Sequence, residues 1–286
     1  QNVSTMADTT FADLEARGWC SAEVASPYVR FFEHLTAQCV PRMLASCDVV
    51  GDSTSSSLTR VLDVATGHGV VAIAAAAKGG QVTAVDFSEP FLDMAKQSAQ
   101  SKGLNNIKFV QADAQKLPFD DASFDVVLCN FGVLHLGEPD AFFAEASRCL
   151  APGGKLAFTV WVAPPKTVPF EITLRSVREC GNADVPLPQG PSFFKYADAA
   201  SVASAMEAVG LEPTVLAEEV PQTMQLDRAE DLFELFATGT VRTRALLRAQ
   251  TDDARRAIAA RMAEEVRTAG LNLPCPACLS VAVKKS

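Results

Sequence analysis

The stretch Val61-Leu-Asp-Val-Ala-Thr-Gly-His-Gly-Val-Val-Ala-Ile-Ala-Ala-Ala76 decides how the rest of the chain is interpreted. An apolar run passes through two glycines into an alanine-rich segment, which predicts a strand, a tight turn and a helix. Such a unit is typical of nucleotide-binding proteins, because backbone N–H groups at the helix N-terminus bind the ligand. Gly67-x-Gly69-x-x-Ala72 matches the dinucleotide fingerprint. The carboxylate of Asp63, at the end of the strand, would instead repel a pyrophosphate.

Segments typical of strands and of helices alternate from about Arg60 onward. We expect strands at Arg60–Ala65, Gln81–Asp86, Ile107–Gln111, Phe124–Asn130 and Lys155–Val162, with helices up to Lys78, after the N-cap Ser88, and over Pro139–Leu150. This alternation predicts an α/β fold in which helices cover both faces of a parallel sheet.

The segments that flank this pattern are mainly helical. Residues 10–47 carry apolar side chains at steps of three and four, and the polar tract 51–57 follows. We therefore expect an N-terminal helical cap and linker at 10–57, and the main domain at 58–286. After a helix at about 198–209 and a strand near 215–220 comes a helical stretch, 228–269, which we expect to form a lid insertion over the carboxyl ends of the strands. A last strand is expected near 278–283.

The composition excludes several classes of partner. The 286 residues include 25 Lys and Arg against 34 Asp and Glu, a net charge of −9, so no basic field would attract nucleic acid. No apolar run approaches the roughly 20 residues of a membrane span, and no signal peptide is apparent, so we expect no membrane association and a cytoplasmic protein. Eight scattered cysteines fit reduced thiols, including the pair Cys275 and Cys278. Nothing in the sequence indicates an oligomeric state.

Acidic residues at the strand ends bear on the identity of the ligand. Asp86 ends the second strand, where a carboxylate can accept both hydroxyl groups of a ribose, in a crevice at the surface. NAD enzymes and adenosyl-ligand enzymes would both use this residue, so it does not separate them. Asp63 suits the ammonium group of an amino-acid ligand, directly or through water. Asp113 follows the third strand and can accept a hydrogen bond from an adenine amino group. Asp63 and Asp113 therefore favour an adenosyl amino acid over a dinucleotide.

With these motifs the sequence resembles the class I S-adenosylmethionine (SAM)-dependent methyltransferases, in particular the small-molecule enzymes related to the ubiquinone/menaquinone C-methyltransferases. The similar segments are Leu62–Gly69, Val85-Asp-Phe-Ser88, Gln111-Ala-Asp-Ala114, Phe124–His135 and the turn Leu150-Ala-Pro-Gly-Gly154. The resemblance implies a Rossmann-like, seven-stranded sheet whose last strand is antiparallel.

The resemblance also implies a role for each matching residue. The methionine portion of SAM would lie against the backbone of Ala65, Thr66, Gly67 and Gly69 in the first motif, and the ribose and adenine would be flanked by Asp86, Phe87 and Ser88. The adenine would also be bordered by Asp113 and Ala114, after the third strand, and the sulfonium would lie near Asn130 and Phe131, after the fourth. His68 departs from the small residue more usual there, and we expect it to face solvent.

The predicted reaction is methyl transfer from SAM to a small-molecule acceptor. A base is required only if the acceptor must lose a proton. His135, which follows the fourth strand, is then the candidate, and the alternative is that this histidine has only a structural role.

Histidines and carboxylates show no metal-ligand spacing, so we expect no metal. The chain is rich in phenylalanine, which favours a small organic acceptor. Two other functions stay open: a catalytically inactive SAM-binding regulatory protein and an NAD(P)-dependent oxidoreductase.

Overall fold

The computed structural model describes residues 10–49 and 58–285, which fall into two compact units. The first unit comprises the described residues up to Leu35 together with Val162–Gly190 and Pro221–Pro276. The second comprises the described parts of Thr36–Trp161, Pro191–Val220 and the C-terminal segment from Ala277. Each unit combines segments from both of the expected domains, 10–57 and 58–286, so the boundaries of the units differ from those of the expected domains. The expected lid, 228–269, lies entirely in the first unit, and the expected linker, 51–57, lies outside the described residues.

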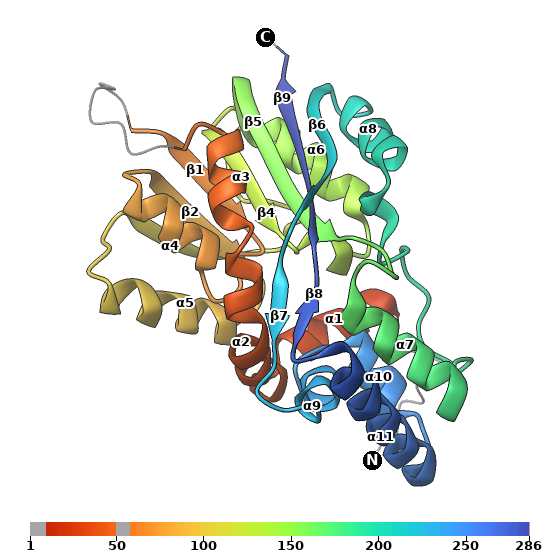
Figure 1. Cartoon of the computed structure of the whole chain (residues 1–286). Coiled ribbons are helices and arrows are strands. Elements are labelled where there is room, and N and C mark those ends of the chain that lie inside the picture. The colour runs from red at the N-terminus through yellow and green to blue at the C-terminus, as the bar shows by residue number, and fades with distance from the viewer. Residues whose placement is uncertain (1–9, 50–57, 286) are drawn as a thin grey trace, which may run out of the picture. The chain divides into compact units, whose positions relative to one another are not determined.

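The second unit is built on a seven-stranded sheet in the order β3-β2-β1-β4-β5-β9-β6 (Figure 1). Its strands are β1 (Arg60–Val64), β2 (Gln81–Asp86), β3 (Ile107–Gln111), β4 (Phe124–Asn130), β5 (Leu150–Trp161), β6 (Leu211–Val220) and β9 (Ala277–Lys284). The five strands from β3 to β5 pair in parallel, whereas β9 is antiparallel to both of its neighbours. The predicted Rossmann-like sheet with an antiparallel last strand is confirmed.

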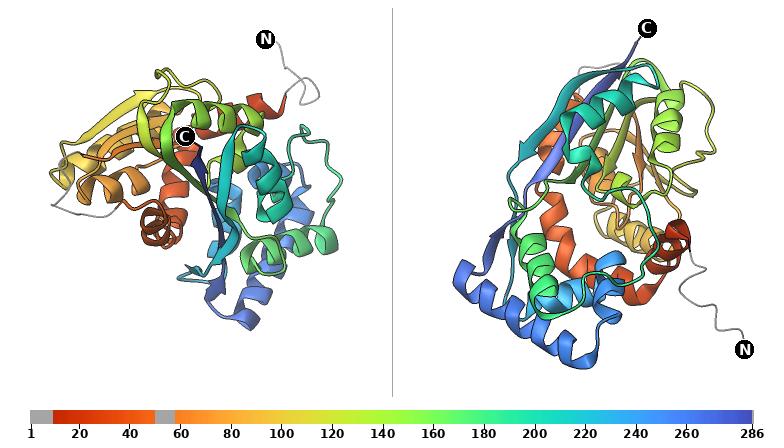
Figure 2. Two further views of the ribbon diagram at one scale, coloured as in Figure 1. Left: turned by 90° about the horizontal axis from the view of Figure 1, so that it is seen from above. Right: turned by 90° about the vertical axis from the view of Figure 1, so that its right-hand side faces the viewer.

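Helices cover both faces of this sheet. On one face lie α3 (Val40–Ser46), α4 (Val70–Ala77) and α5 (Glu89–Ser101), and on the other lie α6 (Pro139–Cys149) and α8 (Ala199–Glu207) (Figure 2). Right-handed crossovers explain this division, because the chain moves from β1 toward one edge through α4 and α5, and from β4 toward the other through α6. Two short 3-10 helices, η2 (Val133–His135) and η3 (Lys195–Ala197), complete the unit.

Local sequence explains most of the element boundaries. Four of the five residues of β1 are buried, as expected for a central parallel strand. Ser88 and Asp198 cap α5 and α8 with their side chains, as the sequence predicts for Ser88. The start of β5 was placed wrongly at Lys155. Leu150 already pairs with Phe124, and the register then shifts, so the expected turn is an irregular segment within the strand.

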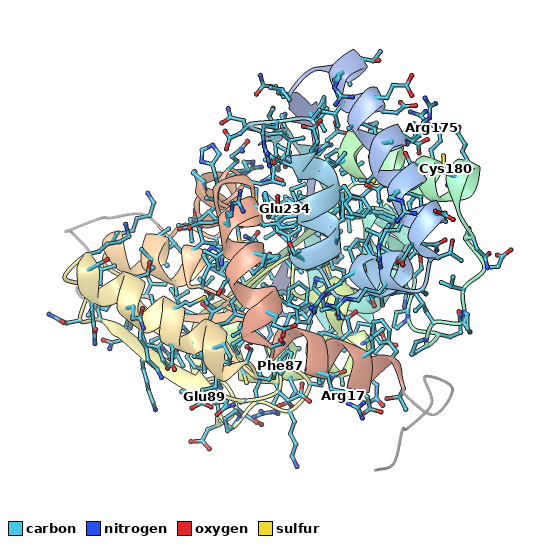
Figure 3. The ribbon with its side chains drawn as sticks, turned by 90° about the horizontal axis from the view of Figure 1, so that it is seen from below. Arg17, Phe87, Glu89, Arg175, Cys180 and Glu234 are labelled. Carbon is cyan, nitrogen blue, oxygen red and sulfur yellow. The ribbon has the colours of Figure 1, made fainter. Side chains whose placement is uncertain are left out.

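The first unit is mainly helical. It contains α1 (Phe11–Trp19), most of α2 (Ala22–Ala37), α7 (Val168–Cys180), α9 (Asp231–Thr238), α10 (Arg242–Arg248), α11 (Asp252–Ala269), and the strand pair β7 (Thr223–Gln225) and β8 (Asn272–Pro274). Figure 3 shows Arg175 on α7 next to α11, where its guanidinium bonds to Glu265. The sequence pattern does not predict α7, which begins with Val168 and Pro169 and contains β-branched residues of low helix propensity. Packing of its apolar face stabilises it instead.

The helices and the cysteines bear on what the composition leads us to expect. None of the helices in residues 10–49 and 58–285 combines the length and the apolar character that crossing a membrane requires. All eight cysteines are free, and both Cys275 and Cys278 are buried. Burial raises the pKa of the Cys278 thiol to about 11, which makes it a poor nucleophile near neutral pH.

Candidate functional site

The glycine turn between β1 and α4 has a strained, left-handed backbone. Ala65 and Gly67 both have φ of 55°, and Gly69 has φ of 90°. A Cβ atom on Gly69 would lie 3.0 Å from the Cβ of Ala95 on α5, so the missing side chain permits close packing. A Cβ on Gly67 would meet nothing within 4 Å. The space beside Gly67 is therefore open to a ligand, whereas the space beside Gly69, on the side where a Cβ would stand, is filled by α5.

Asp86, the last residue of β2, holds this turn in place. Its Oδ2 accepts a hydrogen bond from the N–H of Gly67 at 2.8 Å, and its Oδ1 accepts one from the N–H of Ser88 at 2.9 Å. The residue is only 6% exposed, so the expectation of an open crevice acceptor is wrong. Burial raises the pKa of its carboxyl group to about 6, against the effect of the backbone hydrogen bonds. Each carboxylate oxygen has a second lone pair, so Asp86 can still accept a ligand hydroxyl.

Asp63 supports the turn from inside the protein. Its Oδ2 accepts hydrogen bonds from the hydroxyl of Thr66 at 2.6 Å and from the N–H of Ala72 at 2.9 Å. Burial raises the pKa of Asp63 to about 7, and the nearby charge of Asp86 adds to the effect. Oδ1 of Asp63 is buried and has no hydrogen-bond partner among the described residues. Contact of Asp63 with a ligand ammonium group, direct or through water, therefore requires the turn to shift.

The end of β3 carries an exposed acceptor, Asp113. Its Oδ1 accepts a hydrogen bond from the backbone N–H of Gln115 at 2.8 Å, and the Gln115 side chain accepts one from the N–H of Glu138 at 2.7 Å. Gln115 thus connects the segment after β3 to the segment after β4, a role that the sequence pattern did not reveal. Ala114, between these polar residues, is buried. The Gln115 side chain also donates to Oδ1 and Oδ2 of Asp113, at 3.1 and 3.3 Å, so an adenine amino group would share this exposed carboxylate with Gln115.

Asn130, at the end of β4, joins three separate segments. Its Oδ1 accepts hydrogen bonds from the Thr159 hydroxyl at 2.6 Å and from the Cys39 thiol at 3.2 Å, and its Nδ2 donates to the carbonyl of Thr36 at 3.1 Å. Thr36 and Cys39 flank the junction of α2 and α3, and Thr159 lies on β5. The side chain of Asn130 is thereby held in one orientation. Sequence reasoning missed these partners because they are 29 to 94 residues away.

Phe131, the next residue, turns the chain sharply after β4. Its φ of 55° is left-handed, and its N–H donates to both the carbonyl and the hydroxyl of Thr159, each at 3.1 Å. The ring is 3% exposed and stacks on Trp161, with ring centroids 3.9 Å apart. Phe131 thus contributes a rigid backbone and a buried ring.

Of the two histidines near these strand ends, His135 is the more accessible. It lies on η2, is partly exposed, and meets Phe193 edge-on with ring centroids 5.9 Å apart. His135 is also close enough to Asp86 for its positive charge to lower the pKa of that carboxyl group. His68 is only 7% exposed, so the expectation that it faces solvent is wrong.

The structure brings the predicted cofactor residues to the carboxyl ends of four neighbouring strands, β3, β2, β1 and β4. Phe87, labelled in Figure 3, is half-buried after β2, and its carbonyl accepts a hydrogen bond from Gln111 at 3.0 Å. An open glycine backbone beside buried and exposed carboxylates fits an uncharged ribose and adenine with a cationic end, and it opposes a pyrophosphate. These residues therefore fit SAM. Within the described part of the chain, no three His, Cys, Asp or Glu residues are grouped to hold a metal ion.

Comparison with known proteins identifies related sequences and folds. Residues 62–158 match a family model described as a methyltransferase domain. A demethylmenaquinone methyltransferase of Clavibacter sepedonicus is 42% identical over 106 residues, which cover 37% of this chain and 42% of that protein. The chain spans less than half the length of such curated relatives.

Solved structures share the fold at lower identity. The YcgJ protein of Bacillus subtilis aligns with a TM-score of 0.56 and 20% identity, over 86% of this chain and 98% of that one. A Haemonchus contortus phosphoethanolamine N-methyltransferase, solved with phosphomonomethylethanolamine and S-adenosylhomocysteine (SAH), aligns with a TM-score of 0.55 and 17% identity. That alignment covers 97% of this chain and 61% of the other.

Proposed function

We propose that this chain, whose residues 62–158 form a class I SAM-dependent methyltransferase domain related to the ubiquinone/menaquinone C-methyltransferases, methylates a small organic acceptor. The observation that best supports this proposal is that the buried carboxylate of Asp86 accepts a hydrogen bond from the N–H of Gly67, beside which there is open space for a ligand. The Asp86 carboxylate suits ribose hydroxyl groups, which SAM and a nicotinamide dinucleotide both carry. Asp63, at the end of β1 beside the glycine turn, opposes the pyrophosphate of a dinucleotide, so an oxidoreductase is disfavoured.

Each predicted residue would then hold one part of SAM. Ala65, Thr66, Gly67 and Gly69 would provide backbone for the methionine portion, Asp86 would accept the ribose hydroxyls, and Phe87, Ser88, Asp113 and Ala114 would border the adenine. Bound SAM supplies a methyl group on a cationic sulfur, already activated for displacement. The chain's own contribution is alignment, which can lower such a barrier by about 7–11 kcal/mol in favourable cases.

Asn130 and Phe131 would position the reacting end of the site. The side chain of Asn130 is fixed by bonds to Thr159 and Thr36, and the ring of Phe131 by stacking on Trp161, so neither side chain needs to reorganise. Preorganised groups are effective because no free energy is spent on ordering them during the reaction.

His135 is the proposed base when the acceptor loses a proton. It is partly exposed, near Asp86, and beside the ring of Phe193. A neutral imidazole can accept a proton from a hydroxyl or an acidic carbon. The aromatic neighbour favours an acceptor with an apolar or aromatic body. Thiol, amine and quinol acceptors all fall within this class.

The decisive experiment is a turnover assay with a panel of phenols, quinols, thiols and amines, with SAH formation measured by mass spectrometry. We expect SAH to form with at least one acceptor, and to form more slowly with the Asp86→Ala variant when SAM is below saturation. Parallel calorimetry with SAM and NADH checks the cofactor. Tight NADH binding without SAM binding would overturn the proposal, and SAM binding without turnover across the panel would point instead to a regulatory SAM-binding protein.

A further inference from the structure

A pocket of about 350 Å³ lies within the first unit, and its lining contains no residue of the predicted cofactor site. Its wall contains Arg17 from the last turn of α1 and both Arg244 and Arg248 from α10. The volume is at the lower end of the range found for small-molecule sites. Figure 3 shows Arg17 at the end of α1 in this unit.

The charge of this pocket is opposite to that of the chain. Its lining contains three arginines and no aspartate or glutamate, although the net charge of the protein is −9. Arg17 and Arg248 form no ion pair within residues 10–49 and 58–285. Three guanidinium groups around one small space repel one another, so an anion placed among them would be stabilised.

Arg244 has unused hydrogen-bonding capacity. Its side chain is 13% exposed, and its one ion pair is with Glu23, at 3.0 Å, whose side chain is 77% exposed. An ion pair with so exposed a partner is weak. The Nε of Arg244 is buried and has no acceptor in the described part of the chain. A buried guanidinium N–H without a partner costs free energy, which a bound anion would offset.

The remaining wall is apolar and firmly packed. Leu14, Leu187 and Val241 line the pocket, and Val241 is 5% exposed. A Cβ on Gly18 would lie 2.4 Å from Cγ2 of Val241, so α1 packs directly against this residue. An apolar wall beside arginines recognises a molecule that has both an apolar body and an anionic group.

We infer that this pocket binds an organic anion, a carboxylate or phosphate group attached to a small apolar body. The inference goes beyond the proposed methyl transfer and does not depend on it, since every lining residue belongs to the first unit and every predicted cofactor residue to the second. The guanidinium of Arg244 holds the anionic group, Arg17 and Arg248 add charge, and Leu14, Leu187 and Val241 contact the body.

The test is calorimetry of the full chain with matched probes. Benzoate and phenyl phosphate combine an anionic group with an apolar ring, benzamide keeps the ring without the charge, and acetate and inorganic phosphate keep the charge without the ring. We expect benzoate, phenyl phosphate or both to bind at least tenfold more tightly than benzamide, acetate and phosphate. The tighter of the two anions identifies the head group.

Variants assign the binding to this pocket. Arg248→Gln, at an exposed position without an ion pair, and Arg244→Gln should each weaken anion binding by about tenfold. The control is Arg255→Gln on α11, which makes the same change outside the pocket and should have no effect. Thermal unfolding, measured on every variant, reports whether the protein is folded independently of the anion result. Equal binding of benzamide and benzoate, or undiminished anion binding by both pocket variants with the unfolding temperature retained, would overturn the inference.

Discussion

Asp86 accepts a hydrogen bond from the backbone N–H of Gly67 at 2.8 Å, so the residue that ends β2 fixes the turn that follows β1. The same carboxylate also caps the N–H of Ser88, at the start of α5. One side chain thus orders both backbone segments that are predicted to surround the ribose. Its removal should affect ligand binding and local stability together.

Replacement of Asp86 by Ala should raise the dissociation constant of SAH at least tenfold. The variant lacks the acceptor for ribose hydroxyls, and each charge-assisted bond is worth on the order of 1.5–3 kcal/mol. Calorimetry measures the change. Asp93→Ala is the matched control, because Asp93 is an exposed residue of α5 whose partner is Lys96. Equal SAH affinity in the Asp86 variant would show that the ribose is bound elsewhere.

The pKa of Asp63 makes stability depend on pH. Burial raises it to about 7, above the 3.9 or so of an exposed aspartate, so the folded chain holds a proton that the unfolded chain has released. This contribution to the free energy of unfolding is fully present below about pH 4 and is lost as pH rises through about 7. Its slope is at most about 1.4 kcal/mol per pH unit.

Asp63→Asn tests this dependence. Asparagine can keep its carbonyl oxygen at the position that bonds Thr66 and Ala72, with its amide at the unpartnered Oδ1 position. Urea unfolding from pH 5 to 8 should show the variant gaining stability relative to the parent as pH rises. A constant difference between the two proteins would mean that Asp63 is not protonated in the folded state.

The two glycines of the turn should respond differently to alanine. Gly67→Ala adds a methyl group in open space at φ of 55°, which costs about 1–2 kcal/mol of stability and obstructs the predicted methionine site. Gly69→Ala places a side chain at φ of 90°, farther from the left-handed helical region, and brings its Cβ within 3.0 Å of Ala95, so it should lose more stability.

Gly103→Ala is the control, since Gly103 has φ of 68° and also has nothing within 4 Å of its added Cβ. It should lose about as much stability as Gly67→Ala, yet bind SAH like the parent. Thermal unfolding and calorimetry separate the two effects. Normal SAH binding by Gly67→Ala would place the methionine portion away from this turn.

His135→Ala should lower kcat by about 10²–10⁴ if the acceptor carries a proton that must leave, because that is the usual contribution of a general base. His135→Gln should be almost as slow, since glutamine keeps a hydrogen bond but does not titrate. SAH affinity is the control and should change little. Full activity in both variants would remove His135 from the mechanism, and rescue by glutamine would make it a positioning residue.

The helical segments predicted to close over the cofactor, 228–269 and 11–47, should exchange their amide hydrogens more slowly when SAH binds. Exclusion of water from the reacting methyl group is the physical reason for expecting a lid. Mass spectrometry of peptides from α9, α10 and α11 measures the change. Slower exchange confined to residues 60–135 would show that these helices have no such role.

The sequence predicts the sheet and the site backbone well, because strand ends and glycine turns depend on local pattern. Asp86, Asp113 and Asn130 each follow or end a strand that the pattern locates within a few residues. The partners of these side chains were not predictable, since contacts such as Cys39 with Asn130 join residues far apart along the chain. His68 was misjudged because packing around the turn, which no local pattern reports, determines its exposure.

The position of β9 has a consequence for folding. β9 pairs with β5 on one side and β6 on the other, although both neighbours precede it along the chain. During synthesis β5 therefore emerges with one open edge and β6, whose partner in this sheet is β9, with two, and an open edge is a template for pairing with another chain. Insertion of β9 joins segments with a large sequence separation, which makes the step slow. The nascent protein is thus most exposed to aggregation before β9 emerges, and a chaperone that shields strand edges should raise its folding yield most during that interval.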